Sequence, residues 1–336
     1  MKKSGILRIL KNQKGYILVS IGASLLTLIS LFALVADLGH IFVTKAQLQN
    51  TADAAALASV VEIPAGELTV QQKAQEFGNA HWAGGAQIVI NNQNIEPGSF
   101  DFQAGTFASG ATPVNAVRVE AQRVQGSGPG ALQLFFAPLF GKDTSNVRAR
   151  SLAVLDPHVV GVQSKNRLIP YSVIDFVVDE DGDGLFDIGS TVNIHPRNDA
   201  PGNFGFLDLD MGSNDVPELR AYIEHGYDKE FIIPPGGSVE VPGSTGITGN
   251  SLLNSFGVIL NEIVFLPVHD WVAGEGDGAI FNVVALLAVR ISKVKLTGGH
   301  ESRYIRAEII RYASSVLVTD PEAPANNSVA KPRLAS

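Results

Sequence analysis

Residues 16–36 form an uninterrupted apolar segment that constrains the fold of this chain more than any other feature. None of its side chains carries a charge at neutral pH. An α-helix of about 20 residues crosses the roughly 30 Å hydrocarbon core of a bilayer. In lipid every backbone amide must be paired within the protein, and a helix meets this condition by itself. The sequence therefore predicts a transmembrane helix over residues 15–36. The side chains expected in the membrane include Tyr16, Leu25, Leu28, Phe32 and Ala36.

The charges before this segment predict its orientation. The first 14 residues contain five basic side chains and no acidic one. Basic flanks are retained on the cytoplasmic side of a membrane. We therefore expect residues 1–14 in the cytoplasm and the chain beyond residue 36 outside it. This topology is that of a single-pass protein of the inner (cell) membrane.

A cleaved secretory signal peptide is the alternative interpretation of the apolar segment. Such peptides have an apolar region of about 7–15 residues followed by a small-x-small cleavage site. The present segment is longer, and Leu34 stands where a small residue is required. An Ala-x-Ala triplet occurs at 56–58, but this is about twenty residues beyond the segment. The pattern favours an uncleaved anchor.

The helix is expected to continue beyond the membrane as an amphipathic rod. Ala, Gln, Lys and Leu are good helix formers and are frequent in residues 45–58. Pro64 cannot continue a helix and sets the limit of the rod. Apolar residues recur at helical spacing along this stretch. They are Leu38, Ile41, Phe42, Leu48, Ala52, Ala55 and Ala56.

The same stretch resembles the N-terminal segment of TadG-like proteins of Tad (Flp pilus) assembly systems. In that family a membrane helix is followed by Asp-Leu-Gly and then by Leu-Gln-x-x-Ala-Asp-Ala-Ala-Ala-Leu-Ala. The resemblance implies a membrane-anchored component of pilus assembly without catalytic activity. It also implies that the partners are the lipid bilayer and other pilus-assembly or pilin-like proteins. The matching positions include Asp37, Gly39, Leu48, Gln49, Asp53, Ala54 and Ala55.

Prepilin processing remains an alternative within this family context. Type IV-like prepilins are cleaved after a Gly that follows basic residues, and they carry Glu five residues after it. Here Gly15 follows Lys11 and Lys14, but the fifth residue is Ser20. The missing Glu favours a protein that is not processed at Gly15.

Length and charge limit the remaining possibilities. A chain of 336 residues is long enough for two domains beyond the anchor. Removing the five N-terminal basic residues leaves 20 basic against 33 acidic side chains, a net charge of −13, which argues against a nucleic-acid partner. Cysteine is absent, which excludes disulfides, thiolate zinc sites and a Cys nucleophile.

Residues 37–157 are expected to form a helical stalk and a pilin-like α/β module. A short helix is predicted over 67–82, and residues 131–141 are predicted to form a buried helix broken at Pro138. Alternating apolar and polar residues predict half-buried strands. The strands are expected at 87–96, 99–109, 115–124 and 146–155.

Residues 158–318 are expected to form a β-rich sandwich or barrel-like domain. Strand-like runs alternate there with Gly, Pro, Asp and Asn turns, and only 217–226 and 250–260 are helix-like. Residues 319–336 are polar and rich in proline, which predicts a disordered tail. The fold class is therefore α+β. The predicted strands are 168–178, 191–195, 203–210, 230–241, 262–272, 279–296 and 303–318.

The strongest candidate site in this domain is the acidic stretch DEDGDGLFD at 179–187. Its acids occupy alternate positions of a calcium loop, with a glycine at the sixth. Position 12 is Ser190 rather than the Glu of an EF-hand, and the flanks are strand-like. We expect a structural Ca²⁺ ion, and a solvated acidic turn is the alternative. The predicted ligands are Asp179, Asp181, Asp183, the Leu185 carbonyl and Asp187.

No catalytic residue is predicted. The seven histidines lack the spacing of a metalloprotease site, and there is no nucleophile elbow or phosphate-binding loop. His269 and Asp270 are interpreted as a packed or surface pair. We therefore expect neither an enzyme nor a small-molecule substrate. The alternative to pilus assembly is a calcium-dependent cell-surface adhesin or glycan-binding module.

Overall fold

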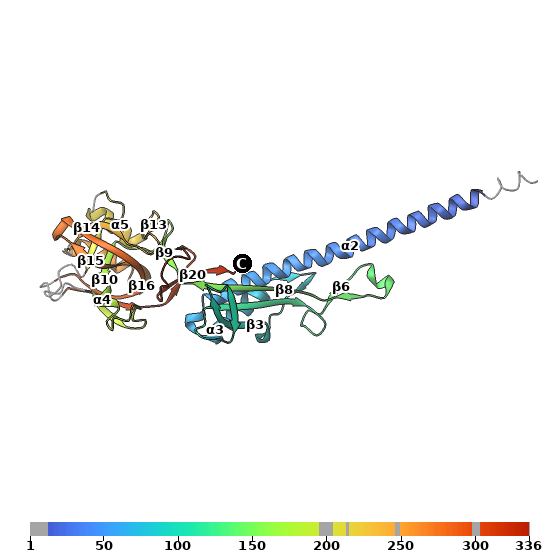
Figure 1. Cartoon of the computed structure of the whole chain (residues 1–336), viewed down its shortest axis with the longest axis horizontal. Helices are drawn as coiled ribbons and strands as arrows, with labels where there is room; N and C mark the ends of the chain where they lie inside the picture. Colours follow the sequence, from blue (N-terminus) through green and yellow to red (C-terminus); the bar gives the residue numbers. More distant parts are fainter. Residues whose placement is uncertain (1–12, 195–203, 213–214, 246–248, 298–302, 336) are drawn as a thin grey trace, which may run out of the picture.

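The computed structural model describes residues 13–194, 204–212, 215–245, 249–297 and 303–335. Most of the predicted cytoplasmic segment 1–14 lies outside this range. The molecule is elongated (Figure 1). A long helix, α2, projects from an α/β module in the middle, and a β-rich domain lies at the opposite end. The α+β architecture predicted from the sequence is confirmed.

Helix α2 (Gln13–Val60) is continuous through the predicted membrane boundary. At 1.5 Å per residue its 48 residues extend about 72 Å. Side chains 16–32 are all exposed, and among the described residues α2 is the one helix long and apolar enough to span a membrane. From Ala33 onward one stripe of the helix is buried against the α/β module. The predicted extension of the membrane helix into a stalk is therefore confirmed.

The predicted apolar face of the stalk is correct in its C-terminal half and wrong near the membrane. Leu48, Ala52 and Ala55 are fully buried. Leu38 and Phe42 are instead exposed, because the module covers the helix on the side of Asp37 and Thr44.

The stalk lies against a six-stranded sheet, with contacts mainly to β5 (Ala116–Arg123) and β8 (Val147–Asp156). These two strands pair antiparallel along their lengths. Residues of β5 alternate between the core and the surface, as their sequence pattern predicted. A second helix, α3 (Glu67–Asn79), packs against α2. The sheet order is β18 (Tyr312–Ala313), β20 (Val329–Leu334), β8, β5, β3 (Ile95–Asp101) and β4 (Thr106–Ser109).

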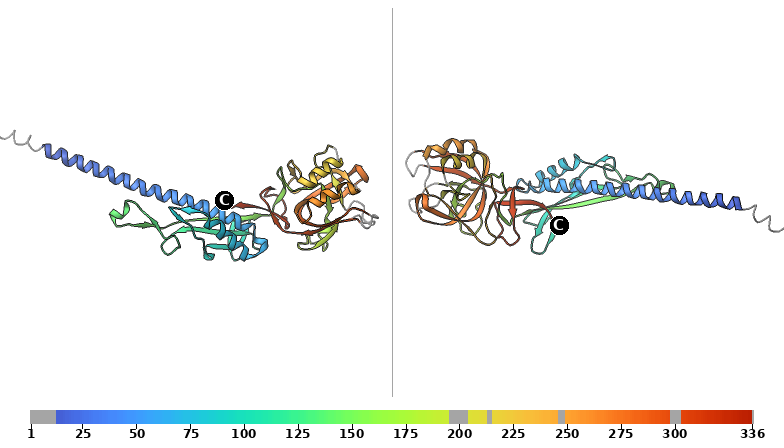
Figure 2. Two further views of the ribbon diagram at one scale, coloured as in Figure 1. Left: turned by 180° about the vertical axis from the view of Figure 1, so that it is seen from behind. Right: turned by 90° about the horizontal axis from the view of Figure 1, so that it is seen from above.

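The prediction of a buried helix at 131–141 is wrong. Two short strands, β6 (Leu132–Gln133) and β7 (Thr144–Ser145), form a hairpin, and a 3-10 turn, η4 (Ala137–Phe140), lies in its loop. The hairpin extends along α2 away from the β-rich domain (Figure 2). Leu132 and Leu134 of the hairpin are buried, but the large apolar side chains of its loop are exposed, because the loop projects beyond the end of the sheet.

The β-rich domain is barrel-like. Among the described residues, the pairings close a ring of five strands through a parallel contact between β10 and β15. Two further strands, β17 and β11, continue the sheet from β16. The ring consists of β16 (Ala279–Lys295), β14 (Val239–Ser244), β12 (Phe204–Leu207), β10 (Tyr171–Ile174) and β15 (Ile263–Ala273). The continuing strands are β17 (Tyr304–Ile309) and β11 (Thr191–Ile194).

Apolar cores lie on both faces of this sheet. One contains Tyr171, Phe206 and Phe256, and is covered by α5 (Val216–His225) and α6 (Leu253–Val258). The other contains Phe265 and Phe281, and includes a three-stranded sheet. Strands buried on both faces read as continuous apolar runs, as β15 and β16 do. The three-stranded sheet is β13 (Phe231–Ile232), β9 (Val159–Val162) and β19 (Leu317–Thr319).

The prediction of a disordered tail over 319–336 is wrong for residues 319–335. Strand β20 returns to the α/β module and pairs antiparallel with β8. Arg333 on β20 donates to the buried carboxylate of Asp156 at 2.8 Å. This ion pair joins β20 to the last residue of β8. Polar and proline-rich composition did not reveal this strand, because its partner lies far away in the sequence. The C-terminal strands therefore cross the predicted boundary at residue 157.

Candidate functional site

The surface of α2 is the first candidate site, because its apolar side chains are exposed up to residue 32 and one side of the helix is buried from Ala33 onward. The predicted membrane residues Tyr16, Leu25, Leu28 and Phe32 are all exposed on the bare part of the helix, and so is Ala36. The hydroxyls of Ser20, Thr27 and Ser30 donate to carbonyls four residues earlier, at 2.8–2.9 Å. These polar groups are thus paired within the helix, as a lipid environment requires.

The second candidate site is Asp37, the first residue of the Asp-Leu-Gly motif. Its carboxylate is buried beneath the loop of the β6–β7 hairpin. It accepts the backbone N–H of Phe135 at 2.7 Å and that of Ala137 at 2.6 Å. The N–H of Phe136 points at both carboxylate oxygens, at 3.2 and 3.3 Å. Asp37 therefore caps the start of η4 from a different element, and fixes the hairpin loop to α2 just after the exposed apolar segment.

The electrostatics of Asp37 follow from these bonds. Burial alone would disfavour the charged carboxylate, but the three backbone donors outweigh it and lower the pKa of Asp37. His40, one turn along the helix, adds a smaller effect in the same direction. The ring of His40 also lies 4.7 Å from that of Phe135, measured between centroids. Asp37 is thus an anion at neutral pH, and the three backbone N–H groups replace the water molecules that would otherwise solvate its carboxylate.

The alanine-rich motif forms a seam between helix and sheet. Ala52, Ala55 and Ala56 have no exposed surface and allow α2 to approach β5 and β8 closely. Asp53 and Ala54 are partly exposed beside the seam, and Gly39 is exposed near the loop. The amide of Gln49 donates to Asp53 at 2.8 Å and to the Arg150 carbonyl at 3.0 Å, which ties the helix to β8. These motif positions therefore carry packing and alignment.

The third candidate site is the acidic loop of the β-rich domain. One carboxylate oxygen from each of Asp179, Asp181 and Asp183 lies within 4.8 Å of the other two. Asp179 accepts backbone N–H groups from Gly182 and Gly184, both at 2.9 Å. Both glycines have positive φ, at 71° and 84°, which lets the chain curl around Asp179. A carboxylate has about four acceptor positions, so these bonds leave room for a cation.

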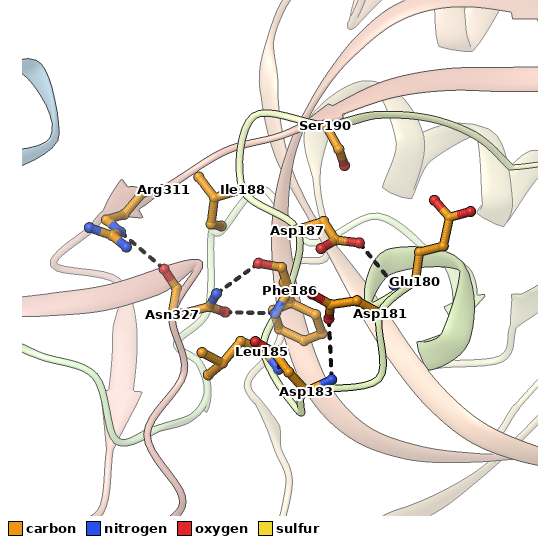
Figure 3. A pocket seen from close by; sticks show the side chains of 10 residues that line it. All are labelled: Glu180, Asp181, Asp183, Leu185, Phe186, Asp187, Ile188, Ser190, Arg311 and Asn327. Carbon is orange, nitrogen blue, oxygen red and sulfur yellow. Dashed lines mark hydrogen bonds between the residues drawn. The ribbon is translucent and has the colours of Figure 1, made fainter.

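The fourth predicted carboxylate ligand, Asp187, is placed differently. Asp187 lies at the base of the loop, where it accepts the N–H of Glu180 at 2.8 Å, and it is not part of the three-carboxylate group (Figure 3). Leu185, whose carbonyl is the fifth predicted ligand, has a half-exposed side chain. The structure thus brings together three of the four predicted carboxylate ligands. A hard cation bound there would complete its shell with water or backbone oxygens.

The acidic loop is attached to the C-terminal segment through Asn327, which sequence analysis did not identify. Its side-chain amide accepts the Phe186 N–H at 3.1 Å and donates to the Phe186 carbonyl at 2.8 Å (Figure 3). Arg311 donates to the Asn327 carbonyl at 3.2 Å. Burial, and then the carboxylates of Asp270 and Asp179, raise the pKa of nearby Asp175. The loop is therefore rigidly held in an acidic environment.

His269 lies inside the β-rich domain. Its Nδ1 is 2.6 Å from the Ser172 hydroxyl, and both residues have no exposed surface. Its ring also lies edge-on to Phe281 at a centroid distance of 5.0 Å. Complete burial among core residues suits a packing role for His269, whereas Asp270 is exposed and accepts from Asn282.

Comparisons with known proteins identify the N-terminal part of the chain. Residues 15–62 match a family described as Flp pilus-assembly, TadE/G-like. Residues 43–153 match a family described as Tad-like Flp pilus-assembly. No curated protein and no solved structure matches the chain. The matched region contains the anchor, Asp37, the alanine seam and the hairpin, and it ends within β8. Residues 15–153 are thus similar to the TadE/G-like and Tad-like families of Flp pilus-assembly proteins.

Proposed function

We propose that this protein is a non-enzymatic component of a Tad/Flp pilus-assembly or secretion system, anchored in the inner membrane and acting through protein–protein contacts. One observation supports this function above the others. The exposed apolar segment 16–32 and the buried alanines of the seam, Ala52, Ala55 and Ala56, belong to one unbroken helix. The same helix would therefore attach the protein to the membrane and form part of the core of the α/β module.

The proposed topology follows from the charges. Basic residues before Tyr16 hold the N-terminus in the cytoplasm. The α/β module and the β-rich domain then lie outside, with the β-rich domain farthest from the membrane along the axis of the molecule (Figure 1). In this arrangement α2 acts as a stalk that presents the β-rich domain to partners.

The bare part of α2 is also suited to a protein partner within the membrane. Space around Gly22 is open, and its neighbours Ala23 and Ser24 are small. Small residues permit close approach of two membrane helices. The anchor can therefore dock against the membrane helix of another pilus-assembly protein.

The acidic loop is proposed to bind a structural Ca²⁺ ion. Three converging carboxylates repel one another without a cation, and alternate Asp residues on a tight turn are typical calcium ligands. The ion would fix the loop against Asn327 and stabilise the β-rich domain. It would supply no chemistry.

The function is tested by deleting the gene in its host and counting surface Flp-type pili. We expect pili to be lost, and to return when the full chain is supplied. A chain with charged substitutions in the membrane segment, such as L25K/L28K, should not restore them. Normal piliation after deletion would contradict the assembly role.

A calcium-dependent adhesin or glycan binder is the second candidate. It is favoured by the exposed ring of Phe176, three residues before the acidic loop. In that case the deletion strain would keep its pili but lose calcium-dependent attachment to surfaces. The D181N/D183N variant would then lose attachment while its pili remain normal.

A further inference from the structure

The loop of the β6–β7 hairpin, residues 135–141, exposes a concentrated apolar surface. We refer to it as the tip loop. Leu139 is 79% exposed and Phe140 74%, and both rings of Phe135 and Phe136 are also exposed. Contiguous apolar patches are rare on water-facing surfaces and mark contact sites. The tip loop is therefore expected to bind an apolar surface or an apolar medium.

The exposure is built into the fold of the loop. Asp37 holds the backbone of residues 135–137, as described above. Within the loop, the Leu139 N–H donates to the Phe136 carbonyl and the Lys142 N–H to the Ala137 carbonyl, at 3.0 and 3.1 Å. Gly141 closes the turn with a φ of 80°. The backbone of the tip loop is thus fixed by a hydrogen-bonded turn in which these side chains are exposed.

The tip loop lies at the outer end of the membrane segment. It borders a cleft of about 180 Å³ between the loop and the helix. The helix side of this cleft runs from Ser30 to Ile41. Thirty ångströms of helix counted from Tyr16 ends near Ala36, in the middle of this range. The loop therefore lies beside the last turns of the proposed span.

Apolar surface at this level continues around the helix. Val35, Phe42 and Val43 are exposed on faces of α2 that the module leaves bare. Two exposed lysines lie close to this zone: Lys142, which lines the cleft after the loop, and Lys45, one turn beyond Ile41 on the helix. Lysines of this kind reach the headgroup region while their apolar neighbours enter the bilayer. The tip loop and the exposed helix surface thus form one apolar zone that is continuous with the membrane segment.

We propose that the tip loop inserts into the extracytoplasmic leaflet as a second membrane contact. The inference rests on the proposed anchoring of α2. Continuity with the lipid-exposed helix identifies lipid as the occupant. Short apolar and aromatic segments bind the interface by burying about 5–10 Å into it. Two contacts, one through the bilayer and one beside it, fix the orientation of the α/β module on the membrane. Asp37 would then be shielded from lipid by the loop that it holds.

The absence of cysteine allows a direct test with single-cysteine variants of the full chain. An environment-sensitive fluorophore is attached to L139C in vesicles of phosphatidylethanolamine and phosphatidylglycerol. L26C, on the bare helix, reports on the anchor itself, and S109C, exposed on β4 in the α/β module, reports on water. Because all three side chains are exposed, labelling leaves the core intact.

We expect the label at 139 to shift to shorter wavelength and to be quenched by lipid-borne nitroxide placed near the headgroups. Quenching by iodide in water should be several-fold weaker at 139 than at 109. If 139 behaves like 109 while 26 is quenched by lipid, the tip loop does not insert, although the anchor is correct. If 139 is shielded from both quenchers, another copy of the chain covers it and the proposal is wrong. An iodide-accessible 26 would instead overturn the anchor itself.

Discussion

The α/β module and the barrel-like domain build their cores by opposite means. In the module, alanines on α2 let a helix lie close against a sheet, and Ala52, Ala55 and Ala56 are fully buried. In the barrel, bulky rings fill the space, and Phe281 sits over Gly205, where an added Cβ would lie 2.1 Å from the ring. The stability of the α/β module should therefore be reduced most by larger side chains in its core, and that of the barrel by smaller ones.

The largest effect is expected from emptying the barrel core. Replacing Phe281 with alanine removes a fully buried ring and should cost about 3–5 kcal/mol of unfolding free energy. Native-state hydrogen exchange of the detergent-solubilised protein measures this loss strand by strand. I280A, at a partly exposed neighbouring position, is the matched control. Equal loss of protection in β5 and β8 would show that the two cores are not independent.

Overfilling the alanine seam should give the next largest effect. A55L adds volume between α2 and the sheet, and should cost about 1–3 kcal/mol because the backbones must separate. Faster exchange is expected in β5 and β8, with β15 and β16 unchanged. A46L places the same side chain at an exposed position of α2 and should be neutral. An equally harmless A55L would contradict the close-packed seam.

Calcium should stabilise the barrel and leave the module unchanged. With a dissociation constant of about 0.1–1 mM, 10 mM Ca²⁺ would add roughly 1.4–2.7 kcal/mol to the unfolding free energy. Thermal unfolding with and without a chelator measures this difference. D181N/D183N should abolish it, whereas E180Q, at a loop acid outside the three-carboxylate group, should retain it. No shift in the unmodified protein would leave the loop as a solvated turn.

The smallest effect is local and depends on pH. The pKa of Asp37 in the folded protein lies below its ordinary value of 3.8. Its stabilising effect is therefore complete above that ordinary value, and is lost as the pH falls through the lowered pKa. Amides 135–137 should exchange faster in that acidic range, after correction for intrinsic rates. D37N should remove this pH dependence, and D53N should not. A pH profile unchanged by D37N would contradict the cap.

Local sequence patterns predicted those helices and strands that can be recognised from their own residues, without knowing which segments they pack against. The length and apolarity of 16–36 predicted the start of α2, and alternation predicted β5. Apolarity misled at 131–141, because a run that binds at a membrane interface and a buried helix have similar composition. The acidic loop was identified from spacing, but its attachment to Asn327 was not.

Long-range pairing explains the remaining misses. Strand β20 pairs with β8 across more than 170 residues of sequence, and Arg333 meets Asp156 only in the folded sheet. Asp37 was known as a motif position, yet its bonding partners lie about 100 residues away on the hairpin. The periodicity of one segment does not show which distant segment it will pair with.

The most direct test of the account is membrane extraction of the native protein combined with the mass of its N-terminus. We predict that the protein stays in the membrane pellet through salt and alkaline washes and begins at its first residues. A mature chain starting near Asp37 or Ser59 would contradict the anchor, because the apolar segment of α2 would have been removed. A start at Tyr16 would keep the helix but contradict the permanent assembly factor, and would identify a processed pilin-like subunit instead.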